Sequence, residues 1–109
     1  MDLLPLPMIS FNKAASGGTI RVNFNEDVST ATAFSMILEP EDGEKQTVTP
    51  TLGTSDVVVG DETFDANKYC EYTTTASQFS YVGRWRLRAT ATLSSSVVAS
   101  DWVLFRVTE

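Results

Sequence analysis

Hydrophobic and polar residues alternate most regularly between Val82 and Ala91. Every second residue from Trp85 onward is apolar, while the positions between them carry arginine or threonine. A period of two residues is typical of a β-strand that has one face in the core and the other in water. The sequence therefore predicts a strand over residues 82–91, whose polar face is formed by Arg84, Arg86 and Arg88.

Shorter segments of the same character recur along the chain. Residues 19–25 alternate in the same way, and the apolar run 33–39 ends at a Pro-Glu-Asp-Gly turn signal. For residues 66–73 the pattern leaves open which parity is buried. The predicted strands cover residues 8–13, 19–25, 33–39, 46–49, 57–59, 66–73, 82–91 and 97–107. Seven to eight short strands separated by turns predict an all-β protein, an immunoglobulin-like sandwich of two antiparallel sheets.

The two tryptophans differ in their surroundings along the chain. Trp85 shares the parity of its apolar neighbours, so we expect it in the core, packed against Phe24 or Phe105 from the facing sheet. Trp102 has the opposite parity from the apolar residues of the last strand, so it is exposed unless a bulge at residues 100–101 turns it inward. An exposed tryptophan is a candidate anchor for a protein interface, or a stacking platform for a sugar.

Residues 1–8 form a predicted N-terminal arm, and residues 9–109 form the sandwich. Pro5 and Pro7 hold the arm extended and exclude it from a central strand. Burying its apolar side chains contributes about 6–12 kcal/mol, whereas ordering its backbone costs about 8–16 kcal/mol. Two alternatives stay open: the arm docks on a neighbouring subunit, or it folds back over its own sandwich edge. Its candidate interface residues are Leu3, Leu4, Leu6 and Met8.

Length and charge narrow the possible functions. The 109 residues fit one domain that can bury a core without disulfides or metals. The net charge is −6, and eleven of the fourteen acidic residues lie between Glu26 and Glu71, whereas four arginines follow Tyr72. An acidic body with one basic strip argues against nucleic-acid binding and favours protein partners. No stretch is long enough to span a membrane and no signal peptide is recognisable, so we expect synthesis in the cytoplasm.

The residue types of the commonest catalytic and metal sites are scarce. The chain has no histidine and a single cysteine, Cys70, so neither a Cys-His nucleophile nor a zinc site can be assembled. We expect Cys70 to be a buried structural thiol. The acidic run 61–65, together with Asp56, could offer oxygens to Ca²⁺ but lacks the ligand spacing of an EF-hand. We therefore expect no enzymatic activity, no metal and no cofactor.

The arginine strip on residues 82–91 has two interpretations. In the first it is a solvated face whose carboxylate partners come from neighbouring strands, with Glu71 and Asp101 as candidates. In the second it docks on an acidic face of a neighbouring copy or of another protein, since a guanidinium group suits bidentate pairing with carboxylates. The residues alone do not decide between these interpretations.

Three segments of the sequence resemble a known family. They are the strand and turn Phe34–Gly43, the segment Tyr72–Ala76 that leads to Gly83-Arg84-Trp85, and the closing strand Ser100–Val107. In these segments the chain is similar to small tailed-phage virion proteins with an immunoglobulin-like fold, related to the N-terminal domain of the phage baseplate upper protein. It departs from their pattern at residues 94–96, where three serines replace a turn that is usually rich in Gly or Asp.

The resemblance implies a non-enzymatic virion protein. Such a protein acts as a capsid decoration protein or as an adaptor at the head-tail junction, tail or fibre, and its partners are capsid or tail proteins and copies of itself. An alternative is a cell-surface adhesive or carbohydrate-binding module of the same fold, which predicts an export signal or flanking domains. The Met1 start and the end just after the last strand favour a complete small protein located in the virion.

Overall fold

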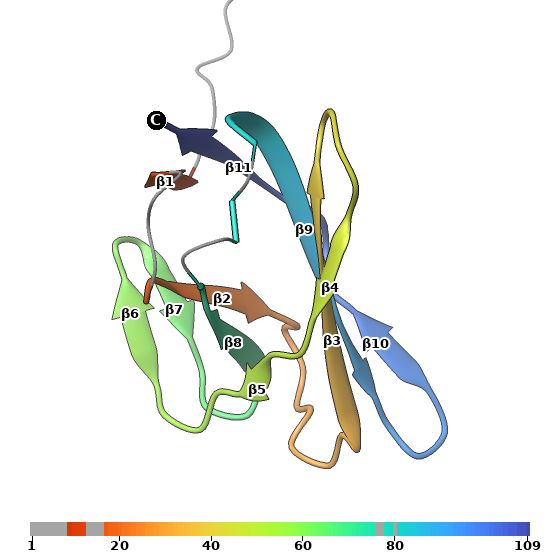
Figure 1. Ribbon diagram of the computed structural model, residues 1–109. Coiled ribbons are helices and arrows are strands. Elements are labelled where there is room, and N and C mark those ends of the chain that lie inside the picture. The colour runs from red at the N-terminus through yellow and green to blue at the C-terminus, as the bar shows by residue number, and fades with distance from the viewer. Residues whose placement is uncertain (1–8, 13–16, 76–77, 80) are drawn as a thin grey trace, which may run out of the picture.

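The protein is described by a computed structural model that covers residues 9–12, 17–75, 78–79 and 81–109 (Figure 1). These residues form β-strands and connecting turns, with no helix among them. The strands are β1 (Ile9–Asn12), β2 (Thr19–Asn23), β3 (Ala33–Pro40), β4 (Gln46–Val48), β5 (Thr51–Leu52), β6 (Val57–Val59), β7 (Glu62–Phe64), β8 (Tyr69–Thr73), β9 (Gly83–Thr92), β10 (Val97–Ala99) and β11 (Val103–Thr108).

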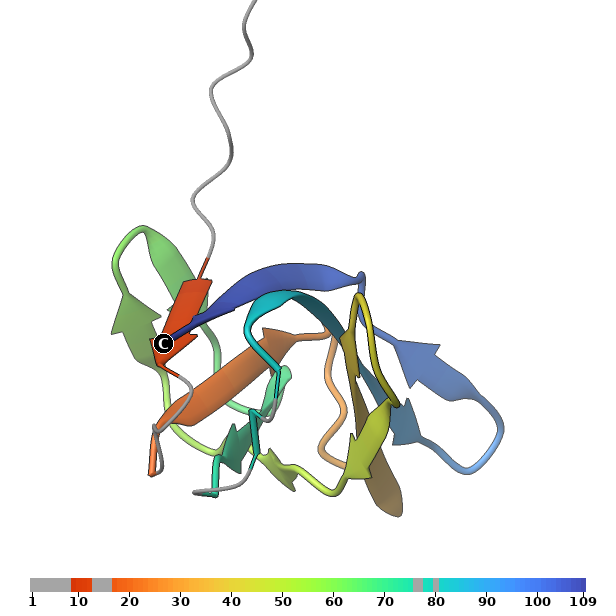
Figure 2. The ribbon, with the colours of Figure 1, turned by 45° about the horizontal axis from the view of Figure 1, so that its top comes forward.

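Two sheets pack face to face around one core. The larger sheet has the strand order β1-β11-β9-β3-β4, with β10 also paired to β9, and the smaller sheet has the order β2-β8-β5. This arrangement matches the C′-C-F-G and B-E-D strand sets of immunoglobulin domains. The predicted fold class is thus confirmed, and Figures 1 and 2 show the two layers.

Two details differ from the predicted strand count and pairing. Strands β6 and β7 form a separate two-stranded ribbon beside the smaller sheet, and the predicted closing strand is divided into β10 and β11. The described residues therefore contain eleven strands rather than seven or eight. In addition, β1 joins the edge of the larger sheet parallel to β11, with Ile9 opposite Phe105. This pairing covers part of an otherwise open sheet edge.

A β-bulge divides the closing strand. The backbone N–H of Ser100 donates to the carbonyl of Ala89, and the N–H of Ala89 donates to the Ser100 hydroxyl. Val103 pairs with Leu87, so two residues, 101 and 102, oppose Arg88. The extra residue reverses the side-chain parity. Consequently Ser100 before the bulge and Val103 after it both face inward, and Trp102 is placed on the outer face. The bulge thus lies at residues 101–102 rather than at 100–101, and it leaves Trp102 on the outer face, where the sequence placed it in the absence of a bulge that turns it inward.

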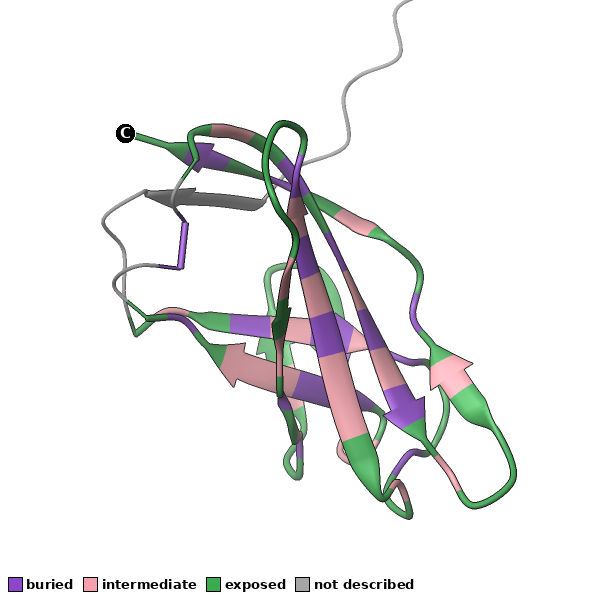
Figure 3. Cartoon of the chain, turned by 45° about the vertical axis from the view of Figure 1, so that its right-hand side comes forward, coloured by how far each residue is buried: buried purple, intermediate pink, exposed green. Residues whose placement is uncertain are grey.

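Strand β9 is the central strand of the larger sheet. It pairs with β3 over eight residue pairs and with β11 over five. Its residues alternate between buried and exposed positions, as the sequence predicts (Figure 3). The buried side chains of this strand are Trp85, Leu87, Ala89 and Ala91.

An aromatic cluster forms the centre of the core next to β9. The ring centroid of Trp85 lies 5.7 Å from those of Phe79 and Phe105, and its indole Nε1 donates to the carbonyl of Tyr81 at 2.9 Å. The predicted contact with Phe105 is confirmed, but Phe105 belongs to the neighbouring strand of the same sheet, not to the facing sheet. Phe24 packs on a different ring, that of Phe34, at 6.2 Å.

Strand β8 buries residues of both parities at its start. Cys70 faces the main core, while Tyr69 packs on Phe64 of the ribbon at a centroid distance of 5.5 Å. The Tyr69 hydroxyl donates to the carbonyl of Ser55 at 2.8 Å. The sequence left this parity open because the ribbon covers the second face of the strand. Burial raises the pKa of the Cys70 thiol to about 12, as expected for a structural cysteine.

Candidate interface on the outer face of the larger sheet

The strand register gathers basic and apolar side chains on the outer face of the larger sheet. Leu104 lies opposite Arg86, and Arg106 lies opposite Arg84. We call this surface the arginine face, and it consists of Arg84, Arg86, Arg88, Trp102, Leu104 and Arg106. The three arginines and the tryptophan that the sequence predicted as interface residues are thus brought together.

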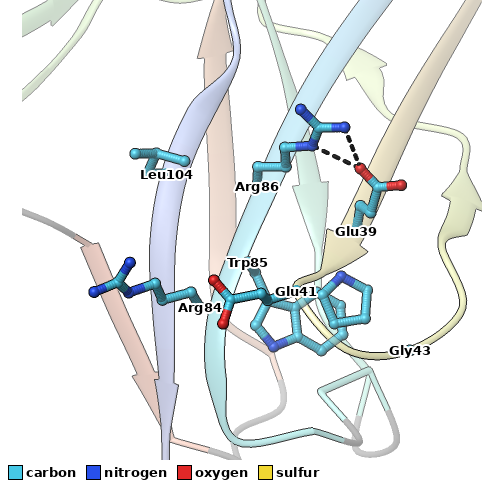
Figure 4. A pocket seen from close by; sticks show the side chains of 8 residues that line it. Glu39, Glu41, Gly43, Arg84, Trp85, Arg86 and Leu104 are labelled. Atoms are coloured by element: carbon cyan, nitrogen blue, oxygen red, sulfur yellow. Dashed lines mark hydrogen bonds and ion pairs between the residues drawn. The ribbon is translucent and has the colours of Figure 1, made fainter.

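Arg86 is held by a carboxylate and an aromatic ring. Its Nε and Nη2 atoms both lie 2.6 Å from Oε1 of Glu39, its cross-strand neighbour on β3 (Figure 4). Its guanidinium carbon lies 4.0 Å from the ring centroid of Trp102, within the range of a cation–π contact. Arg88 approaches the same ring less closely, at 5.6 Å.

The carboxylate partners predicted for the arginine strip are wrong. Glu71 lies on β8 in the smaller sheet, where the register places it opposite Arg21, and the two side chains form an ion pair at 3.5 Å. Asp101 lies in the bulge, and it forms no ion pair within the described ranges. The partner is instead Glu39, because β3 and β9 are adjacent in the sheet. This adjacency could not be read from the sequence pattern.

The other arginines of the face form no ion pair with a described carboxylate. Arg84 and Arg106 are exposed and directly opposite each other, and neither forms an ion pair with any residue that the structure describes. Like charges in such a position destabilise a sheet. The Nε atom of Arg88 is buried, and it has no hydrogen-bond partner in the described part of the chain. The arginine face thus holds uncompensated donors and positive charge.

A pocket lies at the border of the arginine face, between Arg84, Arg86 and Leu104 and the turn after β3. Its volume is about 490 Å³, and its lining combines two arginines and two glutamates with apolar groups (Figure 4). Glu41 borders it because its backbone N–H donates to the carbonyl of Arg84 at 2.9 Å. The lining residues are Glu39, Pro40, Glu41, Gly43, Arg84, Trp85, Arg86 and Leu104. These groups can bind charged and apolar side chains.

Exposed apolar residues complete the arginine face. The side chain of Leu104 is 60 % exposed and that of Trp102 is 39 % exposed. Leu104 and Arg106 were not among the predicted interface residues. Their signal was present in the sequence, because they alternate with the inward residues Phe105 and Val107 and share the parity of Trp102.

The remaining predicted site residues are those of the N-terminal arm and the candidate Ca²⁺ ligands. The arm residues Leu3, Leu4, Leu6 and Met8 lie outside the described residues, so docking of the arm stays a prediction. Asp56, a candidate Ca²⁺ ligand, accepts a hydrogen bond from the backbone N–H of Ala66 at 2.8 Å. Over the described ranges, no group of three acidic or cysteine side chains is arranged to hold a metal ion. The same residues include no helix that is long and apolar enough to cross a membrane.

Comparison with known proteins leaves the family open. No protein-family model matches this sequence, and no curated protein is significantly similar to it. The arguments for function therefore rest on the fold, on the arginine face and on the motif resemblance described above.

Proposed function

We propose that this chain is a non-enzymatic structural protein of a bacteriophage virion. It acts as a capsid decoration protein or as an adaptor at the head-tail junction, tail or fibre, and it docks on an acidic protein surface through its arginine face. The family resemblance of the three sequence segments supports the virion assignment. The composition of the arginine face supports docking by protein–protein contact.

The single observation that carries this proposal is the cross-strand pair of Arg84 and Arg106. The pair is exposed and has no carboxylate partner among the described residues, and it lies beside the exposed Leu104. Such a pair costs stability in the isolated domain. It becomes favourable when a partner supplies carboxylates, since arginine pairs with them in bidentate geometry. Arginine and tryptophan are also the residue types most enriched among energetically dominant interface positions.

Two features argue against other ligands for this face. Glu39 and Glu41 lie among the arginines and would repel the closely spaced phosphates of a nucleic acid. The guanidinium group of Arg86 lies over the ring of Trp102 at 4.0 Å, where a stacked sugar would have to displace it. Both observations favour a protein partner over the carbohydrate-binding alternative.

The test is binding to virus particles that lack this protein. We expect the triple variant Arg84→Gln, Arg86→Gln, Arg88→Gln to bind such particles more weakly than the parent protein. The difference should shrink as salt is added, because ions screen the charge pairs at an exposed interface. The control variant Lys45→Gln, Lys68→Gln removes exposed positive charge elsewhere and should bind like the parent. Equal occupancy by the parent and the triple variant at every salt concentration would refute docking through this face.

A further inference from the structure

The β6–β7 ribbon is a second exposed surface with an unusual composition. Between Asp56 and Asp65 the chain carries four acidic residues and no lysine or arginine. Val58 is 68 % exposed and Val59 is 51 % exposed, and as neighbours in one strand they point to opposite faces of the ribbon. Val59 faces the cleft beside the sandwich, whereas Val58 faces away from it, so Val58 is the apolar residue of the outward face. We call residues 56–65 the acidic ribbon.

The acidic ribbon is a folded element with few attachments to the sandwich. Its strands pair only with each other among the described strands, and Phe64 fastens them by packing on Tyr69. The side-chain amide of Asn23 donates to Glu62 and to the carbonyl of Thr63, both at 3.2 Å. Gly60 provides the positive φ of 59° in the two-residue turn between the strands. The ribbon thus presents its valines and carboxylates in a fixed arrangement.

The acidic ribbon and the arginine face are complementary in charge and in apolar character. One surface offers carboxylates beside the exposed Val58, and the other offers guanidinium groups around Trp102 and Leu104. Complementary potentials of this kind select a partner and fix its orientation.

The two surfaces cannot meet within one molecule. Val59 and Glu62 of the ribbon line a cleft together with Phe105, a buried residue of the larger sheet. The ribbon is therefore on the inner side of that sheet (Figures 1 and 2), whereas the alternation of buried and exposed residues along β9 places the arginine face on its outer side. A contact between the two surfaces requires a second molecule.

We propose that the acidic ribbon of one copy binds the arginine face of the next copy. Val58 contacts Leu104 and Trp102 of the neighbour, and the ribbon carboxylates pair with its Arg84 and Arg106. Because the two surfaces differ, the association is head-to-tail, and it produces a ring if the rotation closes or a filament if it does not. This inference rests on the proposed docking function of the arginine face, and it identifies the partner as a second copy of the chain.

Two charge-reversal variants test the contact by sedimentation velocity over a range of protein and salt concentrations. The face variant is Arg84→Glu, Arg106→Glu, and the ribbon variant is Asp61→Lys, Glu62→Lys. We expect the parent protein to form larger species that dissociate at high salt, and each variant alone to remain a monomer. A mixture of the two variants should associate again, since the native ribbon of the face variant can bind the native face of the ribbon variant.

Matched controls separate this contact from the effect of net charge. The variant Lys45→Glu, Lys68→Glu has the net charge of the face variant, and Glu26→Lys, Glu44→Lys has that of the ribbon variant. All four substituted residues are exposed, and both controls should assemble like the parent. Circular dichroism and the melting temperature check that every variant is folded.

Three results would overturn the inference: a parent protein that is monomeric under all conditions, a ribbon variant that assembles like the parent, or a mixture that does not associate. Particle binding then decides whether the proposed function fails as well. If the face variant loses binding to particles while the ribbon variant retains it, the arginine face docks on another protein and only the self-association is refuted. If the face variant binds particles like the parent, docking through the arginine face is refuted too.

Discussion

The two faces of β9 share one backbone but differ in environment: one is buried and apolar, and the other is exposed and basic. On the inner face, Trp85, Leu87 and Ala89 are almost completely buried, and the aromatic ring packs between two others. On the outer face, Arg86 has a carboxylate partner, whereas Arg84 faces another arginine. The inner face stabilises the fold through apolar packing. The outer face contains the repulsive contact between Arg84 and Arg106, which lowers the stability of the isolated domain.

This difference separates the substitutions that should affect folding from those that should affect binding. Inner residues contribute to the free energy of unfolding because their apolar surface is removed from water. Outer residues contribute through exposed charges, whose effect on stability is small because water and salt screen them. Substitutions on the inner face should therefore lower stability. Substitutions on the outer face should mainly weaken assembly.

The largest expected effect is that of Trp85→Ala on the inner face. Removing a buried indole leaves a cavity, and we expect a loss of about 3–5 kcal/mol in the free energy of unfolding. Urea titration followed by circular dichroism measures this loss. The matched substitution on the outer face, Trp102→Ala, should cost far less because this residue is 39 % exposed. A similar unfolding midpoint for the parent and Trp85→Ala would show that the inner face does not dominate stability.

The second prediction concerns pH and the buried Cys70. Burial raises the pKa of its thiol from the ordinary 9.0 to about 12, so the unfolded chain loses this proton at a lower pH than the native protein. The stabilising contribution is complete below a pH of about 9 and decreases as the pH rises toward about 12. Urea titrations at several alkaline pH values should show a steeper loss of stability for the parent than for Cys70→Ala. Identical pH dependence in the two proteins would contradict the burial of this thiol.

A smaller effect is expected at the bulge between β10 and β11, which lies opposite Arg88 of β9. The hydroxyl of Ser100 accepts a hydrogen bond from the backbone N–H of Ala89 at 3.0 Å in a buried environment. Ser100→Ala leaves this N–H without its side-chain partner, so we expect a loss of about 1–3 kcal/mol in the free energy of unfolding. The exposed Ser96 provides the control, since Ser96→Ala should leave the thermal midpoint unchanged. If both variants melt like the parent, the side chain of Ser100 does not stabilise the bulge.

The sequence predicted which side chains of a strand are buried better than it predicted which strands lie side by side. The alternation around Trp85 placed the core and the arginine strip on opposite faces, because side-chain parity is a local property of a strand. The partner of Arg86 was wrong because Glu39 comes from a strand far away in the chain, and its adjacency depends on sheet order. The burial of both Tyr69 and Cys70 escaped the pattern for the same reason, since a separate ribbon covers the second face.

The smallest expected effect concerns the one compensated arginine of the outer face. Arg86 lies 2.6 Å from Glu39, but the two side chains are 48 % and 32 % exposed, and solvent weakens the ion pair. A double-mutant cycle with Arg86→Gln and Glu39→Gln should therefore give a coupling energy of about 0.2–1 kcal/mol. Urea titrations at low and high salt measure this energy, which should fall as salt is added. In Arg86→Gln the fluorescence of Trp102 should change, because the guanidinium group over its ring is lost. A coupling of several kcal/mol would mean that the outer face also determines stability, and the separation between the two faces of β9 would not hold.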